Sequence, residues 1–168
     1  MHPVDRLIRE ATLFPRHLSE IEIGRIREHV ARQPIDSRVA YVKQEIRRLP
    51  GEWKGQTISR IRALPLVEIH VIERVMIDLQ WPEGTSNEKY TLDLQDAVRR
   101  AEGIYTYGFR GQAYVGFLAT TTVRALGAEP LTWVAYSASF GVIRTGYQVK
   151  SVGEVFRSGF PPNWLPQR

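Results

Sequence analysis

The sequence predicts an α+β protein in which N-terminal helices precede a mainly antiparallel β-sheet with one further helix. Three patterns predict this: helical spacing of apolar residues in the first fifty positions, alternate spacing from Val67, and two late segments rich in aromatic and β-branched residues. A chain of 168 residues has the length of one ordinary domain. We therefore expect a single domain over 1–168, with a helical front at 1–50, a sheet-containing part at 51–168, and any subdomain boundary near 50–55.

The helical front contains two helices with clear boundaries. The first is predicted over 4–14 and ends at Pro15. Ser19 and Glu22 have the spacing of a capping box, in which each side chain accepts from the backbone N–H of the other residue. This motif predicts a second helix that starts at Ser19 and stops at Pro34.

A third helix is predicted after Asp36, which is a suitable N-terminal cap, and it should stop at Pro50. Arg47 and Arg48 would lie in its last turn, where positive charge is favourable. The inward-facing residues at helical spacing are Val39, Val42, Ile46 and Leu49.

Between Val67 and Trp81 the apolar residues fall on alternate positions, which is the spacing of a strand. A strand of about fifteen residues would be unusually long, so we expect a bend, a bulge or a helical segment near Glu73. In a continuous strand Glu73 would point into the core, where an unpaired carboxylate is costly. Either Glu73 meets an arginine there, or the strand bends and the carboxylate reaches water; we favour the bend.

The second half of the chain predicts one helix and the first strands of a sheet. Apolar spacing between Leu94 and Ala101 indicates a helix that ends near Gly103. Strands are expected at 104–107 and 114–123, although Gly116 leaves the second segment open to a helical interpretation.

The clearest strands are 131–136 and 141–149, and the short connection between them predicts a hairpin. The proline-rich tail at 159–166 should have no regular structure, because proline removes backbone donors and fixes φ. We expect Phe160 and Trp164 to hold this tail against the body.

Composition favours a globular protein with a weak preference for anionic partners. The chain has 23 Lys and Arg against 18 Asp and Glu, a net charge of +5, and mostly arginine among its cations. Arginine suits phosphate, which favours RNA or another nucleic acid as a partner, although a solvated basic surface explains the charge equally well. No signal peptide or membrane-spanning segment is visible, so we expect a cytoplasmic protein without a membrane partner, or one exported by a signal-independent route.

Several catalytic motifs are absent from the sequence. With no cysteine, disulfides, thiolate nucleophiles and cysteine-based zinc sites are excluded. There is no phosphate-binding loop, nucleophile elbow, zinc-protease motif or dinucleotide fingerprint. We therefore predict no metal site and no cofactor.

His70 is the histidine best placed to act in a site, because the other three lie in the helical front. On the predicted strand it shares a face with Glu68 and Arg74. Histidine is the easiest general acid or base near neutral pH. A solvated histidine on the face of a strand explains the residue equally well.

The segment 140–148 carries the most suggestive pattern. In a strand, Thr145 and Tyr147 face the same side and present a hydroxyl group beside an aromatic ring, whereas Arg144 faces the opposite side. Such a pair can bind a phosphate oxygen and stack on a base. Thr and Tyr are also common strand residues, so a purely structural interpretation stays open.

A helical front followed by an antiparallel sheet, with Thr145 and Tyr147 in a late strand after Gly141, Val142 and Ile143, resembles the barnase/EndoU/colicin/RelE group of metal-independent ribonucleases. The resemblance covers about the last hundred residues. It implies RNA cleavage by attack of the ribose 2′-hydroxyl on the adjacent phosphate.

The resemblance also assigns roles and partners. Thr145 and Tyr147 would contact phosphate and base, His70 would be the acid or base by its chemistry, and Arg110 or Arg144 would stabilise the phosphate charge. Members of this group are often toxins, so a cognate immunity protein or antitoxin is an implied partner. The second histidine and the lysine of the EndoU branch have no counterpart here.

Arg110 lies among aromatic residues in the stretch IYTYGFRGQAY. Arginine interleaved with aromatic rings is typical of single-stranded nucleic-acid sites, and a bent hairpin with core aromatics has the same pattern. Three functions are therefore compatible with the sequence: a metal-independent endoribonuclease of the toxin type, a non-catalytic nucleic-acid-binding module that uses arginines such as Arg47 and Arg48, and a structural or interaction protein of a phage or secretion system.

Overall fold

The computed structural model describes residues 1–38, 64–156 and 164–168 and confirms the α+β class. The helices are α1 (Pro3–Leu13), α2 (Glu20–Val30), α4 (Leu66–Ile72), the π-helix η3 (Glu73–Ile77), α5 (Asn87–Arg100) and α6 (Val152–Val155). The strands are β1 (Gly103–Phe109), β2 (Gln112–Thr120), β3 (Leu131–Ser137), β4 (Val142–Val149) and β5 (Leu165–Pro166).

The sheet has five strands in the order β4-β3-β2-β1-β5, and each neighbouring pair is antiparallel. β1 to β4 therefore form a meander of consecutive hairpins. The β1–β2 turn consists of Arg110 and Gly111, whose φ angles are 50° and 74°. Two positive φ angles are typical of the tight turns whose twist matches that of paired strands.

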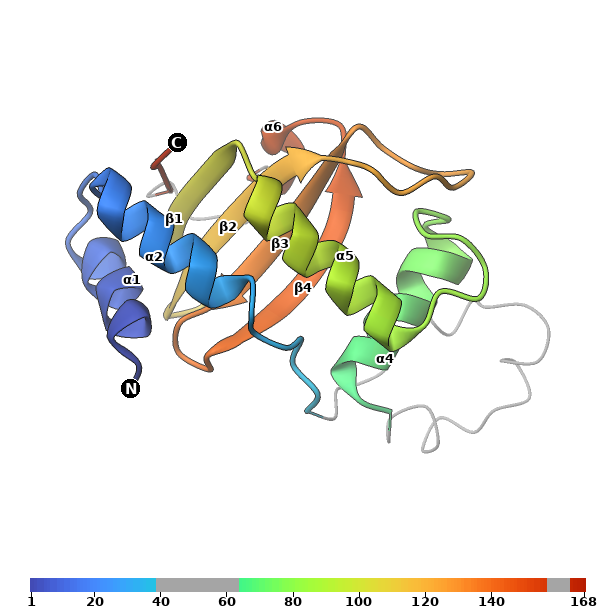
Figure 1. Cartoon of the computed structure of the whole chain (residues 1–168), viewed down its shortest axis with the longest axis horizontal. Helices are drawn as coiled ribbons and strands as arrows, with labels where there is room; N and C mark the ends of the chain where they lie inside the picture. Colours follow the sequence, from blue (N-terminus) through green and yellow to red (C-terminus); the bar gives the residue numbers. More distant parts are fainter. Residues whose placement is uncertain (39–63, 157–163) are drawn as a thin grey trace.

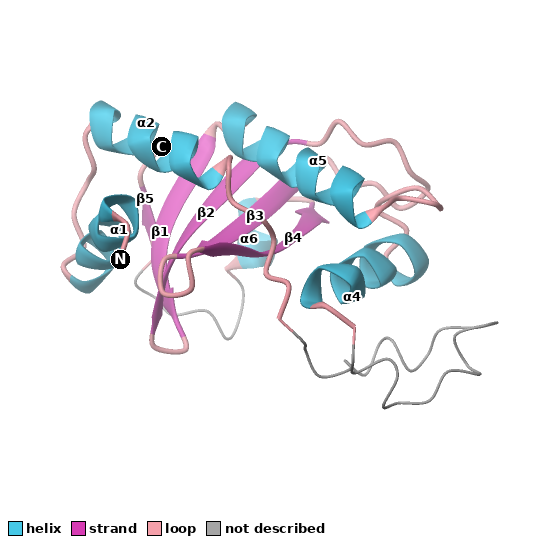
Figure 2. Ribbon diagram, turned by 60° about the horizontal axis from the view of Figure 1, so that its bottom comes forward, coloured by secondary structure: helices cyan, strands magenta, loops and turns pink. Residues whose placement is uncertain are grey.

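Helices cover one face of this sheet. α2 and α5 lie side by side across the strands, α1 lies beside β1, and α4 lies beside β4 (Figures 1 and 2). The core beneath them is formed by alternate strand residues such as Val115, Phe117, Val134, Tyr136 and Ile143. This face is the main hydrophobic core.

The opposite face of the sheet is aromatic. Its second cluster includes Tyr107, Tyr114, Trp133 and Tyr147, and the strands bring these rings into contact across the sheet. Gly116 makes this packing possible, because a Cβ at this position would lie 2.0 Å from a ring carbon of Trp133. The sheet therefore separates an aliphatic core from an aromatic layer.

The segment 67–81 differs most from its prediction, because it forms α4 and η3 instead of a long strand. Alternate apolar positions also contain the i, i+4 rows of a helix, and burial of Leu66, Ile69 and Ile72 follows helical spacing. Glu73 does not reach water: it is buried and pairs with Arg74 at 3.5 Å. The arginine partner was therefore correct, and the expected exposure of the carboxylate was wrong.

Most other local predictions are confirmed. The capping box of Ser19 and Glu22 is present, and α1 and α5 occupy the predicted regions. Segment 114–123 forms a strand through Thr120 and no helix. The helix predicted after Asp36 lies outside the described residues, although the Asp36 carboxylate accepts the N–H of Arg38 at 3.0 Å as a capping residue would.

The tail is more ordered than predicted where the structure describes it. Leu165 and Pro166 pair with β1, which corrects the expectation of no regular structure, and Trp164 stacks on Phe156 with ring centroids 4.6 Å apart. Phe160 lies outside the described residues. Among the helices described, none is both long enough and apolar enough to cross a membrane.

Candidate functional site

A pocket of about 420 Å3 opens on the aromatic face of the sheet. It collects every residue for which the sequence predicted a catalytic role, together with Arg144. Arg47 and Arg48, the other predicted nucleic-acid contacts, lie outside the described residues. The pocket is lined by Leu66, His70, Arg74, Tyr107, Phe109, Arg110, Tyr114, Trp133, Ala135, Arg144, Thr145 and Tyr147.

β4 supplies Thr145 and Tyr147 to this pocket from the same face, as their spacing predicted. Arg144 also lines the pocket, so its predicted position on the opposite side is wrong. The reason is a β-bulge: Ala135 pairs with Thr145 and Tyr136 pairs with Ile143, which leaves Arg144 as the extra residue. A bulge redirects side chains locally, and here it turns a guanidinium group toward the pocket.

Aromatic rings line the pocket beneath these polar groups. Tyr107 and Tyr114 face each other across β1 and β2 and stack with centroids 5.4 Å apart and planes 13° apart. Trp133 pairs with Tyr147 in the same way across β3 and β4. Burial, with smaller effects of Tyr147 and Tyr114, raises the pKa of Tyr107 well above its usual value, so its hydroxyl stays protonated.

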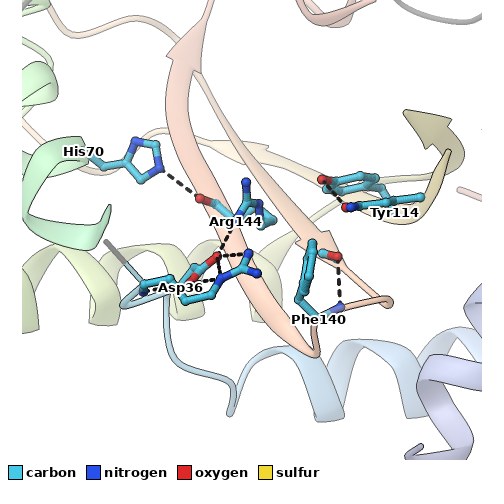
Figure 3. Close-up of polar contacts among 8 residues, drawn as sticks. Asp36, His70, Tyr114, Phe140 and Arg144 are labelled. Carbon is cyan, nitrogen blue, oxygen red and sulfur yellow. Dashed lines mark hydrogen bonds and ion pairs between the residues drawn. The ribbon is translucent and has the colours of Figure 1, made fainter. Parts of the chain in front are cut away.

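His70 enters the pocket from α4 and bonds to the edge of β4. Its Nε2 lies 2.9 Å from the carbonyl oxygen of Arg144 (Figure 3). A carbonyl oxygen only accepts hydrogen bonds, so Nε2 carries a hydrogen. The side chain is buried, and its orientation is set by this bond to the strand.

Side chains cap the whole outer edge of β4 in this way. The Gly146 carbonyl accepts from Arg74 Nε at 2.8 Å and from the Tyr90 hydroxyl, and the Gln148 carbonyl accepts from Gln80 Nε2 at 3.0 Å. Burial raises the pKa of Tyr90 to about 12, so Tyr90 remains a donor. An edge strand whose carbonyls are occupied does not recruit another strand, which gives His70 a structural role as well as a chemical one.

The sequence analysis missed Arg74 as a site residue. It lies one helical turn after His70, and both side chains reach β4, a relation that becomes visible only when 66–77 is interpreted as helix. Burial alone would lower the pKa of Arg74, but Tyr90, Glu73 and Asp78 outweigh this effect, so the pKa is raised and the guanidinium stays charged. Its charge is therefore balanced from behind by two carboxylates.

The rim of the pocket carries a second group of cations. Arg144 and Arg38 both contact the buried carboxylate of Asp36 (Figure 3), and the Arg38 guanidinium lies 3.8 Å from the centre of the exposed Phe140 ring. Burial would raise the pKa of Asp36, but hydrogen bonds from Arg38 and Arg144 outweigh it and hold the pKa below its usual value. The carboxylate stays ionised and fixes Arg144 at the rim.

Arg110 projects from the β1–β2 turn at the other side of the pocket, with its guanidinium 5.1 Å from the centre of the Phe109 ring. A positive φ is uncommon for a residue other than glycine, and here the tight turn imposes it. Both interpretations of its aromatic neighbours hold in part: Tyr107 is fully buried in the aromatic cluster, whereas the Phe109 ring borders the pocket.

The pocket lining is strongly cationic in the part of the chain that the structure describes. It contains Arg74, Arg110, Arg144 and His70 and no carboxylate. Within the same residues, no group of three or more potential ligands could hold a metal ion. The arrangement offers positive charge, hydroxyl groups and aromatic rings to a ligand that is anionic and planar in part.

Comparisons of the chain with known protein families, with curated proteins and with solved structures found no match.

Proposed function

We propose that this chain is a metal-independent endoribonuclease that cleaves single-stranded RNA in the pocket on the aromatic face. The observation that carries the proposal is the lining, which combines Arg110 and Arg144 with aromatic rings and contains no carboxylate among the described residues. Guanidinium groups bind phosphates, and rings stack on bases. A single strand is favoured because its bases are free to reach the rings.

The proposed reaction is an internal transfer at phosphorus. The 2′-oxygen of one nucleotide attacks the adjacent phosphorus and loses its proton, while the bond from phosphorus to the 5′-oxygen breaks and that oxygen gains a proton. The products are a 2′,3′-cyclic phosphate and a 5′-hydroxyl. Arg110 and Arg144 can stabilise the negative charge that builds up on the phosphate, as a metal ion does in other nucleases.

His70 and Tyr147 are the lining residues best suited to move these protons. The imidazole has the usual pKa nearest to neutrality. Because Nε2 is bonded to the Arg144 carbonyl, any proton exchange of His70 with RNA has to use Nδ1. Tyr147 offers a hydroxyl group on the same face as Thr145.

The test uses a labelled single-stranded RNA of about twenty nucleotides, matched with the same sequence in DNA and in 2′-O-methyl RNA. We expect cleavage of RNA in the presence of EDTA, products that end in cyclic phosphate, and no cleavage of the other two strands. Tyr147→Phe keeps the ring and should retain binding while slowing cleavage by about 100-fold or more, the usual contribution of a proton-transferring group. Cleavage that disappears in EDTA would contradict the proposal.

Two substitutions separate the chemical and structural roles of His70. Gln at this position can still donate to the Arg144 carbonyl but cannot exchange a proton near neutrality, whereas Ala removes both functions. We expect His70→Gln to keep the melting temperature and lose cleavage. If His70→Gln is fully active and only His70→Ala is impaired, His70 holds the edge of β4 and does no chemistry.

A second candidate function is binding of single-stranded RNA without cleavage. It is favoured by one observation, the burial of His70 and the engagement of its Nε2 with the backbone. This function predicts affinity for RNA that falls steeply with salt and no products after long incubation. Induced expression in bacteria distinguishes the two in cells: the ribonuclease should arrest growth, and His70→Gln should relieve the arrest.

A further inference from the structure

Arg74 is held on every nitrogen of its guanidinium group. Nε donates to the Gly146 carbonyl at 2.8 Å, one terminal nitrogen contacts Asp78 at 3.0 Å and Glu73 at 3.5 Å, and the other donates to Thr145 Oγ1 at 3.2 Å. Only 6% of the residue is exposed. A group so enclosed, with its charge balanced by two carboxylates, is not a cation that a phosphate can displace.

The contact with Thr145 determines what its hydroxyl can offer to a ligand. A guanidinium group has only donors, so the Thr145 oxygen must accept this bond and keeps its own hydrogen for another partner. In the described parts of the chain, the Thr145 hydroxyl makes no other hydrogen bond. A hydroxyl that accepts from a cation is polarised and becomes a better donor.

We infer that the Thr145 hydroxyl donates to a non-bridging oxygen of one RNA phosphate, and that Arg74 is the positioning residue that sets this polarity. The inference rests on the proposed function and assigns the group that this side of the pocket recognises. Thr145 lines the pocket together with Arg144 and Arg110. Three donors around one cavity, with no carboxylate among its described lining residues, select a group that only accepts and is negatively charged, which is a phosphodiester rather than an amine.

The phosphate contact is tested by two substitutions at Thr145. Val has the shape of Thr without the hydroxyl, and Ser keeps the hydroxyl. We expect Thr145→Val to weaken binding of single-stranded RNA about 10- to 100-fold, as for a hydrogen bond to a charged group, and Thr145→Ser to bind nearly as the wild type does. The salt dependence of binding should not change, because no charge is removed.

The identity of the contacted group is tested with oligonucleotides that carry single uncharged methylphosphonate linkages, placed in turn along the strand. At one position the wild type should lose affinity and Thr145→Val should lose little more, because the same contact is already missing. Equal losses in both proteins at all positions would overturn the phosphate assignment. Unchanged affinity of Thr145→Val for ordinary RNA would overturn the inference and leave the proposed function standing.

The positioning role of Arg74 is tested by Arg74→Lys, which keeps a charge for Glu73 and Asp78 but has one nitrogen instead of three. If the variant folds, the double variant with Thr145→Val should bind RNA no more weakly than Thr145→Val alone. Additive losses would contradict the positioning role. If Arg74→Lys does not fold, the Thr145 variants decide the inference by themselves, and a wild type that binds no RNA overturns both the inference and the proposed function.

Discussion

Two polar clusters lie on opposite faces of the same sheet and satisfy their hydrogen bonds in different ways. Beneath the helices, the Tyr136 hydroxyl donates to Asp5 Oδ1 at 2.7 Å and lies 3.1 Å from His29 Nε2. His2 stacks on His29 with ring centroids 4.0 Å apart. This cluster joins α1, α2 and β3, and its one buried carboxylate has partners within the chain.

The pocket on the aromatic face has the opposite balance. Arg110 and Arg144 add positive charge that no carboxylate of the described lining residues offsets, and the Thr145 hydroxyl keeps a hydrogen to donate. Burial of polar groups is common to both places, and so is a histidine near an acid or a tyrosine. The difference shows that unmatched charge beside aromatic rings, and not the presence of histidine, distinguishes a candidate ligand site from a structural network.

The largest effect that tests this contrast is expected from Arg144→Gln. Loss of this cation should slow RNA cleavage about 100- to 1000-fold, as loss of one charge-stabilising donor usually does. The salt dependence of binding should fall by about 0.7, the value for one phosphate contact on a single strand. Stability should change little, because Asp36 keeps its pairing with Arg38.

Arg25→Gln is the matched control for this variant, since Arg25 is an exposed arginine of α2 outside the pocket. It removes the same charge at a distance from the aromatic face. Equal losses of cleavage in the two variants would show that net charge matters and that the pocket has no special role.

The sequence predicted those parts of the fold whose determinants are local. The capping box at Ser19 and the turn residues between strands act within a few positions, and the corresponding elements are present. Segment 66–77 failed because its decisive bonds are distant: His70 and Arg74 bind carbonyls more than seventy positions away on β4. Alternate apolar spacing cannot distinguish a strand from a helix when both periods fit the same positions.

The candidate site divides along the same line. The shared face of Thr145 and Tyr147 follows from the strand period alone, and chemistry alone was enough to select His70 and Arg110. The side on which Arg144 lies depends on a bulge opposite Ala135 and Tyr136, which no local pattern encodes. Arg74 escaped notice for a related reason, because its partner Thr145 is visible only when β4 packs against the helix.

A smaller effect, on stability and not on activity, is expected from Tyr136→Phe. The substitution removes the donor to the buried Asp5 carboxylate and should cost about 1–3 kcal/mol of unfolding free energy, measured by denaturant titration. RNA cleavage by the folded fraction should be unchanged. Tyr147→Phe should show the reverse pattern, with normal stability and slow cleavage.

These two tyrosine variants make a crossed comparison of the two faces. If Tyr136→Phe slows cleavage without changing stability, the cluster beneath the helices takes part in the chemistry. The contrast between a structural cluster and a ligand site would then be wrong.

The smallest effect concerns the pH dependence of stability. Burial, together with the adjacent His2, lowers the pKa of His29 below its usual 6.5, and Asp5 offsets this only in part. The unfolded chain therefore binds a proton at His29 more readily than the folded chain does. Stability from this residue is complete above pH 6.5 and declines as the pH falls toward the lowered pKa, with a slope of at most about 1.4 kcal/mol per pH unit for one proton.

Denaturant titrations between pH 8 and pH 5 measure this slope, and His29→Gln is the informative variant because an amide can still donate to Tyr136 without titrating. We expect the variant to lose part of the decline that the wild type shows below pH 6.5. A steeper decline in His29→Gln would mean that protonated His29 stabilises the fold through Asp5. The cluster beneath the helices would then depend on an ion pair, and it would resemble the charged pocket more closely than its hydrogen bonds indicate.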